Sequence, residues 1–423
     1  MKPDFREEKQ IVRDYYAQLD GAEHTDIPSV FETFTSSEYH WRGYHPFNEI
    51  TSGREVAESF WQPLRGALSA MQRRMDVFMA GQNAIIGTGG VWVVSMGHLL
   101  GLFDHPWLGR PPTKRIAMLR YCEFHRVDDG KISQTAMFFD IPHLMTQAGL
   151  NPFPPQTAAH LVQPGPKTHE GVMLGPQDSA SGGKTLSLID DMIRTLGKWD
   201  SDLSLQDELR QTWAEDMIWW GPEGIGATYT IERYANQHAG PFRATFTNRS
   251  KTRHIARLAE GNFGGFFGWP NFTAIPSGGF MGMPATNTPG EFRVIDIYRR
   301  DADKLAENWI FIDLLHFWKM QGVDILAHVD AIAAFEEEAD FILQGMQRYN
   351  QDKAEGTTIA LPTRSFSDNE TVSLGSVDIQ VLHLGPAHDP GDTQVWIPQW
   401  GIMIAGDIAF HERMLPIFQG TCT

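Results

Sequence analysis

The sequence of 423 residues is poor in several features, and each shortage excludes a class of protein. Only two cysteines are present, so we expect no disulfide framework and a reducing compartment. No apolar run reaches the roughly 18 residues of a membrane-spanning helix. The N-terminus is charged and lacks the apolar core of a signal peptide. We therefore expect a cytoplasmic protein without a membrane partner.

Basic residues are scarce as well. Acidic residues number 52 against 35 basic ones, which gives a formal net charge of −17. Because no run of Lys and Arg interrupts this excess, binding to nucleic acid or to an anionic membrane is not expected. Hydrophobic residues make up 42% of the chain, which is enough for packed cores in about three domains.

One string of residues occurs twice, with a constant spacing of 173 positions. Eight of the thirty positions over 120–149 are identical to those over 293–322, where chance would give about two. The identical pairs are Arg120/Arg293, Arg126/Arg299, Asp128/Asp301, Lys131/Lys304, Phe138/Phe311, Asp140/Asp313, His143/His316 and Gly149/Gly322. We infer two copies of one domain, the first over residues 1–150 and the second over 185–326.

Each copy places helices before antiparallel strands, which is the α+β pattern. An apolar stripe over 11–19 predicts the first helix, and Asp26 is expected to cap the second. Alternating β-formers predict strands over 73–140, with a hairpin turn at Asp128-Asp129-Gly130. We equate Trp220 of the second copy with Trp41 of the first.

Two further segments differ from the copies. Residues 151–184 contain six prolines and a Ser/Gly-rich stretch, and they predict an irregular linker. Residues 327–423 repeat nothing upstream. Their pattern predicts a helix over roughly 328–349 and strands at 371–384, 394–397 and 402–405.

The repeated carboxylates Asp140 and Asp313 each follow an apolar strand and open an apolar helix that stops at Gly149 or Gly322. One interpretation is structural, because Asp is a good N-cap and Gly is the usual residue after a helix. The other is functional. A carboxylate held partly dry by aromatic walls has a raised pKa and can exchange protons at neutral pH.

Under the functional interpretation, His125 and Asp140 form a proton-handling pair in the first copy. The second copy has Tyr298 in place of His125, so Tyr298 and Asp313 would differ in chemistry or be inert. We name Asp140, His125 and Asp313 as the candidate catalytic residues.

Eight further residues are expected to line the two substrate pockets, although each could equally be a core residue or a partner in an ion pair. They are Trp41, Tyr44, His98, Arg126, Trp220, Trp269, Tyr298 and Arg299.

The order of Gly109-x-Pro-x-Thr113, the Asp-Asp-Gly-Lys-Ile turn and the apolar strand ending in Asp140 resembles the SnoaL-like polyketide cyclases of the NTF2-like superfamily. The resemblance covers nearly all of each copy. It implies two cone domains in tandem, each a curved antiparallel sheet wrapped against helices. It also implies acid/base chemistry without a cofactor, with Asp140 as the acid/base. The cyclases carry a histidine at the position of Arg126, so aldol cyclisation itself does not follow.

The segments Leu382–Asp392 and Ala405-Gly-Asp407 resemble the second half of the metallo-β-lactamase superfamily. This resemblance implies that His388 is a zinc ligand and that Asp407 bridges two metals. The family's His-x-His-x-Asp-His cluster is missing, and two ligands cannot complete a catalytic zinc site. We therefore expect residues 327–423 to form a truncated αβ half-domain, left by a gene fusion or completed by another chain.

Three functions are compatible with these patterns. The leading one is cyclisation, isomerisation or dehydration of a small apolar carbonyl substrate, with no cofactor. The second is a ligand-binding or scaffold protein without catalysis. The third is a zinc-dependent hydrolase fragment. Association into a homo-oligomer is left open.

Overall fold

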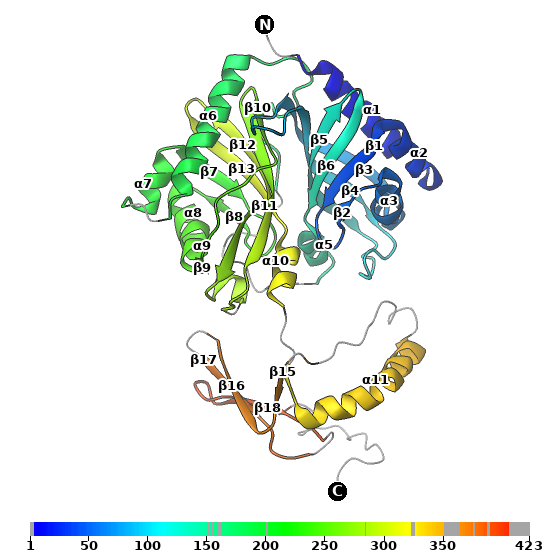
Figure 1. The fold of residues 1–423 in the computed structure, drawn as a ribbon, viewed down its shortest axis with the longest axis vertical. Helices are drawn as coiled ribbons and strands as arrows, with labels where there is room; N and C mark the ends of the chain where they lie inside the picture. Colours follow the sequence, from blue (N-terminus) through cyan, green and yellow to red (C-terminus); the bar gives the residue numbers. More distant parts are fainter. Residues whose placement is uncertain are drawn as a thin grey trace. The chain divides into compact units, whose positions relative to one another are not determined.

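The computed structural model forms two compact units, residues 1–321 and 322–423, and both mix helices with strands (Figure 1). It describes all residues except 1–3, 151–152, 154–155, 157, 159–162, 200–201, 284, 323–325, 351–361, 363, 375–376, 387–389 and 406–423. No helix in the described part of the chain combines the length and the apolar character needed to cross a bilayer.

The first half of unit 1, residues 4–150, is a six-stranded sheet with helices on one side. Its helices are α1 (Arg6–Gly21), η1 (His24–Asp26), α2 (Ile27–Phe34), α3 (Gly53–Val56), the π-helix η2 (Ala57–Trp61), α4 (Gln62–Ala67) and α5 (Ile141–Gln147). Its strands are β1 (Thr35–Gly43), β2 (Asn48–Ile50), β3 (Leu68–Gln82), β4 (Val91–Phe103), β5 (Ile116–Asp128) and β6 (Lys131–Phe139). The sheet order is β2-β1-β6-β5-β4-β3.

The second half of unit 1, residues 163–321, repeats this plan. Its helices are α6 (Ser179–Leu196), α7 (Leu205–Arg210), α8 (Ile231–Tyr234), the π-helix η3 (Ala235–Ala239), α9 (Gly240–Ala244), η4 (Phe280–Gly282) and α10 (Leu314–Gln321). Its strands are β7 (Trp213–Trp220), β8 (Ala227–Tyr229), β9 (Phe246–Thr247), β10 (Ala256–Glu260), β11 (Phe263–Pro276), β12 (Gly290–Asp301) and β13 (Lys304–Ile312). The sheet order is β10-β11-β12-β13-β7-β8, with β9 paired to β11.

The two sheets have the same strand order when one is read from the opposite edge. In each sheet the neighbours run antiparallel except for one pair, β1 with β6 and β7 with β13, which is parallel. The expectation of purely antiparallel sheets was therefore wrong at one pair in each half. In each half the first strand pairs with the last one, and these two strands run in the same direction.

The strand register corrects one predicted equivalence between residues of the two halves. Trp41 lies opposite Thr135, and Trp219 lies opposite Asn308, which is 173 positions after Thr135. Trp219 therefore corresponds to Trp41, and the assignment of Trp220 was wrong. Because successive strand residues point to opposite faces, this shift of one residue places Trp220 on the other face of the sheet.

The two sheets face each other across an apolar layer, while α1 to α3 and α6 to α9 lie on the outer sides (Figure 1). Phe267 of the second half packs against Trp92 and Phe124 of the first half, at ring-centroid distances of 5.4 and 5.3 Å. The Arg120 guanidinium lies 3.9 Å from the centroid of the Phe311 ring. The two halves thus share one core.

A buried ion pair also joins the halves. Lys9 Nζ on α1 lies 2.7 Å from Glu260 Oε1 on β10, and both side chains are almost fully buried. Lys9 also donates to the Met173 carbonyl, and the Ala80 backbone N–H donates to Glu260 Oε2, each at 2.7 Å. Every charged atom of this pair therefore has a partner, as a buried charge requires.

The structure confirms several local predictions. The apolar residues Val12, Tyr15, Tyr16 and Leu19 form the buried face of α1. The Asp128–Gly130 turn joins β5 and β6 as a hairpin. Gly149 and Gly322 follow their helices with φ of 78° and 71°, in the left-handed region that glycine adopts readily.

Two local predictions were wrong. Asp26 precedes α2 but its side chain makes no capping hydrogen bond. The end of the expected linker, residues 179–184, is helical, because Asp178 caps α6 through the Ser181 N–H. Packing against β10 then overrides the low helix propensity of this Ser/Gly-rich stretch.

Unit 2 holds the predicted helix, α11 (Val329–Asn350). Its strands are β14 (Leu326–His328), β15 (Arg364–Phe366), β16 (Asn369–Leu374), β17 (Val377–Leu382), β18 (Gln394–Ile397) and β19 (Ile402–Ile404). Strands β14 and β15 are parallel, and β16 to β19 form an antiparallel sheet in chain order.

We predict that Lys9→Met lowers the free energy of unfolding by about 3–5 kcal/mol, because it leaves the buried Glu260 carboxylate without its counter-ion. Urea unfolding followed by circular dichroism measures the loss. Adding Glu260→Gln should recover part of it, while the exposed Arg13→Ala should shift stability by less than about 0.5 kcal/mol. An unchanged midpoint for Lys9→Met would contradict this role.

Candidate functional site

Asp140 is buried where β6 turns into α5, and both of its carboxylate oxygens accept backbone hydrogen bonds. The His143 N–H donates to Oδ1 at 3.1 Å, which caps the helix. The N–H of Glu223, from the other half, donates to Oδ2 at 3.0 Å. The carboxylate therefore joins its own helix to a loop of the second half.

Asp313 repeats this arrangement in the opposite direction. The His316 N–H donates to Oδ1 at 3.2 Å, and the His45 N–H from the first half donates to Oδ2 at 3.0 Å. Arg293 Nη1 lies 3.6 Å from Oδ2. Burial raises the pKa of Asp313 to about 7, although the His45 N–H and the Arg293 charge oppose this shift.

We call Asp140 and Asp313 with these amide partners the reciprocal caps. The two aspartates are 4% and 0% exposed, and neither is among the residues that line the cavities described below. This geometry supports the helix-cap interpretation of both aspartates.

His125 and Asp140 are not brought together. His125 Nδ1 lies 2.9 Å from Thr135 Oγ1, and its Nε2 lies 2.8 Å from the Tyr16 hydroxyl. That hydroxyl donates to Glu123 Oε2 at 2.6 Å. No hydrogen bond or ion pair joins His125 to Asp140 within the described residues.

Glu123 is the buried acid of the first half, and it is neutralised there. Arg73 Nη1 donates to Glu123 Oε2 at 2.9 Å. Burial would raise the pKa of Glu123, but Arg73, His125 and Tyr16 together bring it below the ordinary value. The interior of the first half thus contains a closed polar network.

Arg126 and its counterpart Arg299 form ion pairs. Arg126 Nε lies 2.9 Å from Asp128 Oδ2, and Arg299 pairs with Glu307. This confirms the ion-pair interpretation that the sequence left open for both.

Most of the other predicted pocket residues belong to the cores or to the interface. Trp41 packs on Phe60, Tyr44 packs on Phe139, His98 Nδ1 lies 3.3 Å from Asp76, the Trp220 carbonyl accepts from Arg120, and Trp269 lies under Arg293. Trp220 also lines a hollow beside β8. His388 and Asp407 lie outside the described residues.

A cavity of about 150 Å³ lies between the second sheet and the helical segments α6, α8, η3 and α9. Its walls are mainly aromatic and aliphatic. The polar or charged residues that line it are Tyr234, His238, Arg243, Arg249, Asn271 and Asp296. Phe292, Val294 and Asp296 alternate along β12 and therefore share the face that meets the cavity.

Asp296 is the acid of this cavity. Asn308 Nδ2 donates to its Oδ1 at 3.0 Å, and the Tyr298 side chain also hydrogen-bonds to it. Within the described chain it has no ion-pair partner. Burial raises the pKa of Asp296 to about 7, so both protonation states are accessible near neutral pH.

Two further polar side chains line the cavity, one neutral and one positively charged. His238 on η3 stacks on Trp219 at 4.1 Å, and burial lowers its pKa to about 3, so the ring is neutral. Its Nδ1 has no hydrogen-bond partner among the described residues. The half-buried Arg249 lies over the Phe272 ring at 4.5 Å and supplies a positive charge.

The two halves therefore place acids at equivalent positions in different surroundings. Glu123 and Asp296 are 173 positions apart, as are Thr135 and Asn308. Sequence reasoning missed this pair because it counted only identical residues. An acid flanked by Ile295 and Ile297 on a central strand was the available signal, because charged residues are almost never buried without a reason.

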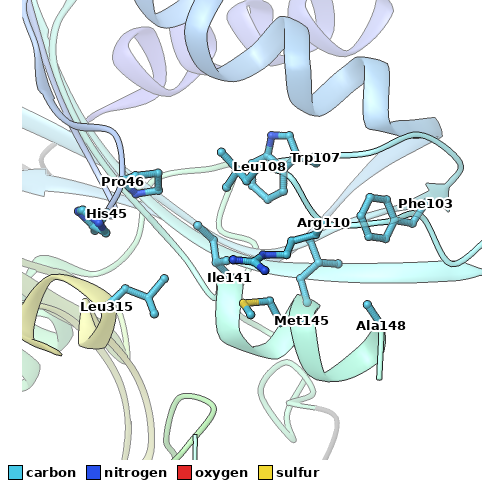
Figure 2. Close-up of a pocket in the computed structure, with 11 residues that line it drawn as sticks. His45, Pro46, Phe103, Trp107, Leu108, Arg110, Ile141, Met145, Ala148 and Leu315 are labelled. Carbon is cyan, nitrogen blue, oxygen red and sulfur yellow. The ribbon is translucent and has the colours of Figure 1, made fainter. Parts of the chain in front are cut away.

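A second cavity, of about 250 Å³, lies beside α5 (Figure 2). Its lining is mostly apolar, and Arg110 reaches between Ile141 and Met145. None of its lining residues is a carboxylate, so it offers no carboxylate base.

Comparison with solved structures finds similar folds over about a third of the chain. An NTF2-like protein from Burkholderia xenovorans LB400 is 16% identical, with 34% of this chain and 98% of that chain covered and a TM-score of 0.28. A proposed SnoaL-like polyketide cyclase from Jannaschia sp. CCS1 is 17% identical, with coverages of 36% and 95% and a TM-score of 0.27. An LEH-like epoxide hydrolase from M. tuberculosis is 11% identical, with coverages of 33% and 90% and a TM-score of 0.25.

No protein-family model and no curated protein sequence matches this chain.

We predict that Asp140→Asn and Asp313→Asn each lower the free energy of unfolding by about 2 kcal/mol. Each carboxylate accepts hydrogen bonds from two backbone N–H groups. In the asparagine variant the side-chain NH2 group faces one of these N–H groups, so that hydrogen bond is lost. Thermal unfolding measures the loss. Asp129→Asn, at an exposed turn, is the control and should be neutral. Wild-type stability in both cap variants would contradict the role of the reciprocal caps.

A second prediction concerns pH. The raised pKa of Asp296 means that the folded state holds this proton more tightly than the unfolded state. Its contribution to stability is therefore present below the ordinary pKa of 3.8 and is lost as pH rises through about 7. The melting temperature of Asp296→Asn relative to wild type should rise between about pH 5 and about pH 8. A difference that stays constant with pH would contradict the assigned pKa.

Proposed function

We propose that the chain contains two SnoaL-like domains of the NTF2-like type in tandem, predicted over residues 1–150 and 185–326, and that the second of them catalyses acid/base chemistry on a small apolar carbonyl compound. The observation that carries the proposal is Asp296, a buried acid that borders a cavity and makes no direct ion pair within the described residues, although the Arg120 charge acts on it from a distance. The repeated motifs and the shared strand order support the tandem arrangement.

The chemistry follows from the groups at the cavity. Asp296 in its carboxylate form removes a proton from the carbon next to a carbonyl, and the bonding electrons move onto the carbonyl oxygen. The resulting enolate oxygen is stabilised by the positive charge of Arg249. Return of the proton from Asp296 to another carbon gives an isomer. Return of the same proton to a β-hydroxyl, which then leaves as water while the C=C bond forms, gives dehydration. A base with a pKa near 7 suits both directions of proton transfer.

The cavity indicates the class of substrate. Its volume of about 150 Å³ lies below the roughly 300–1,000 Å³ of drug-sized sites, so the ligand is small. Its apolar lining, including Phe242, Phe272 and Phe292, favours a ring or short chain with few polar groups.

The first half then has a structural role. Arg73 neutralises Glu123, and the polar groups around it are paired with one another. The sequence assigned catalysis to Asp140, His125 and Asp313, and that assignment is the alternative that an experiment must separate from Asp296.

The test is exchange of the α-protons of small apolar ketones in D2O, followed by NMR, because it requires no knowledge of the final product. We predict that the wild type accelerates exchange for at least one ketone and that Asp296→Asn loses at least about 100-fold in rate. Asp216→Asn, at an exposed position on β7, is the control with the same chemical change.

The outcomes separate the alternatives. Exchange that survives in Asp296→Asn but is lost in folded Asp140→Asn would return the catalytic role to Asp140. Ketones that bind in the cavity without any exchange would favour the ligand-binding alternative.

A further inference from the structure

The cavity beside α5 is built by both halves of unit 1, and it shares no lining residue with the cavity beside Asp296 (Figure 2). We call it the α5 cavity. Besides α5, it is lined by the β1–β2 turn, by the connection between β4 and β5, and by Leu315 of α10. Because Leu315 belongs to the second half, neither half forms this cavity alone.

Backbone hydrogen bonds fix the walls of the α5 cavity. Trp107 and Arg110 exchange two backbone hydrogen bonds, of 3.2 and 2.9 Å, around the two-residue turn Leu108-Gly109. The φ angles of the turn residues are 49° and 69°, and tight turns of this kind need positive φ at both. A leucine rarely adopts such a φ, yet here it places an apolar side chain in the cavity lining. On the other side, the His45 N–H is held by the Asp313 carboxylate at 3.0 Å, so the cavity is formed before any ligand arrives.

Arg110 gives this cavity a positive charge. Its guanidinium lies between Ile141 and Met145 (Figure 2) and makes no side-chain hydrogen bond or ion pair within the described residues. The rest of the lining is apolar except for His45, and it contains no carboxylate. In a chain with a formal net charge of −17, an apolar cavity with an arginine and no acid departs from the overall charge balance. The cavity therefore suits an anion with an apolar body.

The surroundings of His45 favour a ligand of the same charge. Burial lowers the pKa of His45, and the positive charges of Lys319 and Arg293 lower it further, so the ring is neutral at pH 7. The Asp313 carboxylate nearby already accepts hydrogen bonds from two backbone N–H groups. An anion that enters the cavity therefore meets positive charge from both halves of the unit.

We propose that the α5 cavity binds an aliphatic monocarboxylic acid, with the carboxylate on the Arg110 guanidinium and the chain between α5 and α10. The planar guanidinium offers a carboxylate two parallel N–H donors, which neither an alcohol nor an amine can use in the same way. An apolar cavity of about 150 Å³ holds benzene, so the volume of about 250 Å³ corresponds to roughly ten heavy atoms, the size of octanoate. This site is separate from the acid/base chemistry proposed for Asp296.

The experiment titrates the full chain with octanoate below its micelle concentration and follows binding by calorimetry. Octanol and octylammonium are the matched probes, because they have the same chain and a neutral or positive head group. We expect one equivalent of octanoate to bind. Octanol should bind at least about tenfold more weakly, because it lacks the charge-assisted hydrogen bonds, and octylammonium should not bind measurably.

Variants separate the charge of the site from its apolar lining. Arg110→Gln should weaken octanoate binding at least about tenfold and leave octanol binding unchanged, while Arg110→Lys, which keeps the charge without the planar fork, should lose less. Ala148→Phe fills the cavity and should abolish binding of both probes. Arg13→Gln, the same change at an exposed position of α1, is the matched control and should bind like the wild type. Circular dichroism establishes that each variant is folded.

Three results would overturn the proposal. One is equal octanoate affinity in Arg110→Gln and the wild type, and another is the absence of octanoate binding to the wild-type chain. The third is loss of octanoate binding in Arg249→Gln with full binding in Arg110→Gln, which would place the acid in the cavity beside Asp296. Tighter binding of octanoate than of octanol, lost in Arg110→Gln and kept in Arg249→Gln, would confirm the α5 site.

Discussion

The face-to-face packing of two sheets is the constraint on which unit 1 depends, and the reciprocal caps show how it is held. Each half ends its last strand with an aspartate that caps the following helix with one oxygen and binds an amide of the other half with the second. A buried carboxylate needs donors on both oxygens, and in each case the other half supplies a backbone N–H to the second oxygen. Folding of each half is thereby coupled to docking against the other.

The two halves share one fold but hold their buried acids differently, because only the acid of the first half has an arginine as a direct ion-pair partner. In the first half, Arg73 from β3 reaches Glu123 and neutralises the acid. In the second half no arginine or lysine pairs with Asp296 among the described residues, and a cavity lies beside it. Desolvation is the largest single influence on the pKa of both acids. For Asp296 it prevails, whereas for Glu123 the Arg73 charge and the hydrogen bonds of His125 and Tyr16 together outweigh it.

The sequence predicted what depends on local pattern. It located the repeat, the helix that follows each repeated aspartate, and the glycines that end those helices, because caps and left-handed residues have local signatures. It could not predict that Glu223 and His45 supply the second donors, since those contacts cross between the halves. It also placed the linker end wrongly, because Thr185 bonds to the Gly261 carbonyl and ties α6 to the sheet.

An unneutralised buried acid costs stability, and this structure indicates where the compensation lies. The first half keeps its charges paired, and the buried pair of Lys9 and Glu260 fastens it to the second half. A single domain with Asp296 alone would bear the whole desolvation penalty against a marginal free energy of folding. With two similar halves, one can supply packing and paired charges while the other holds an acid beside a cavity. On this argument, the paired charges of the first half and the acid without a direct ion pair in the second are two parts of one arrangement.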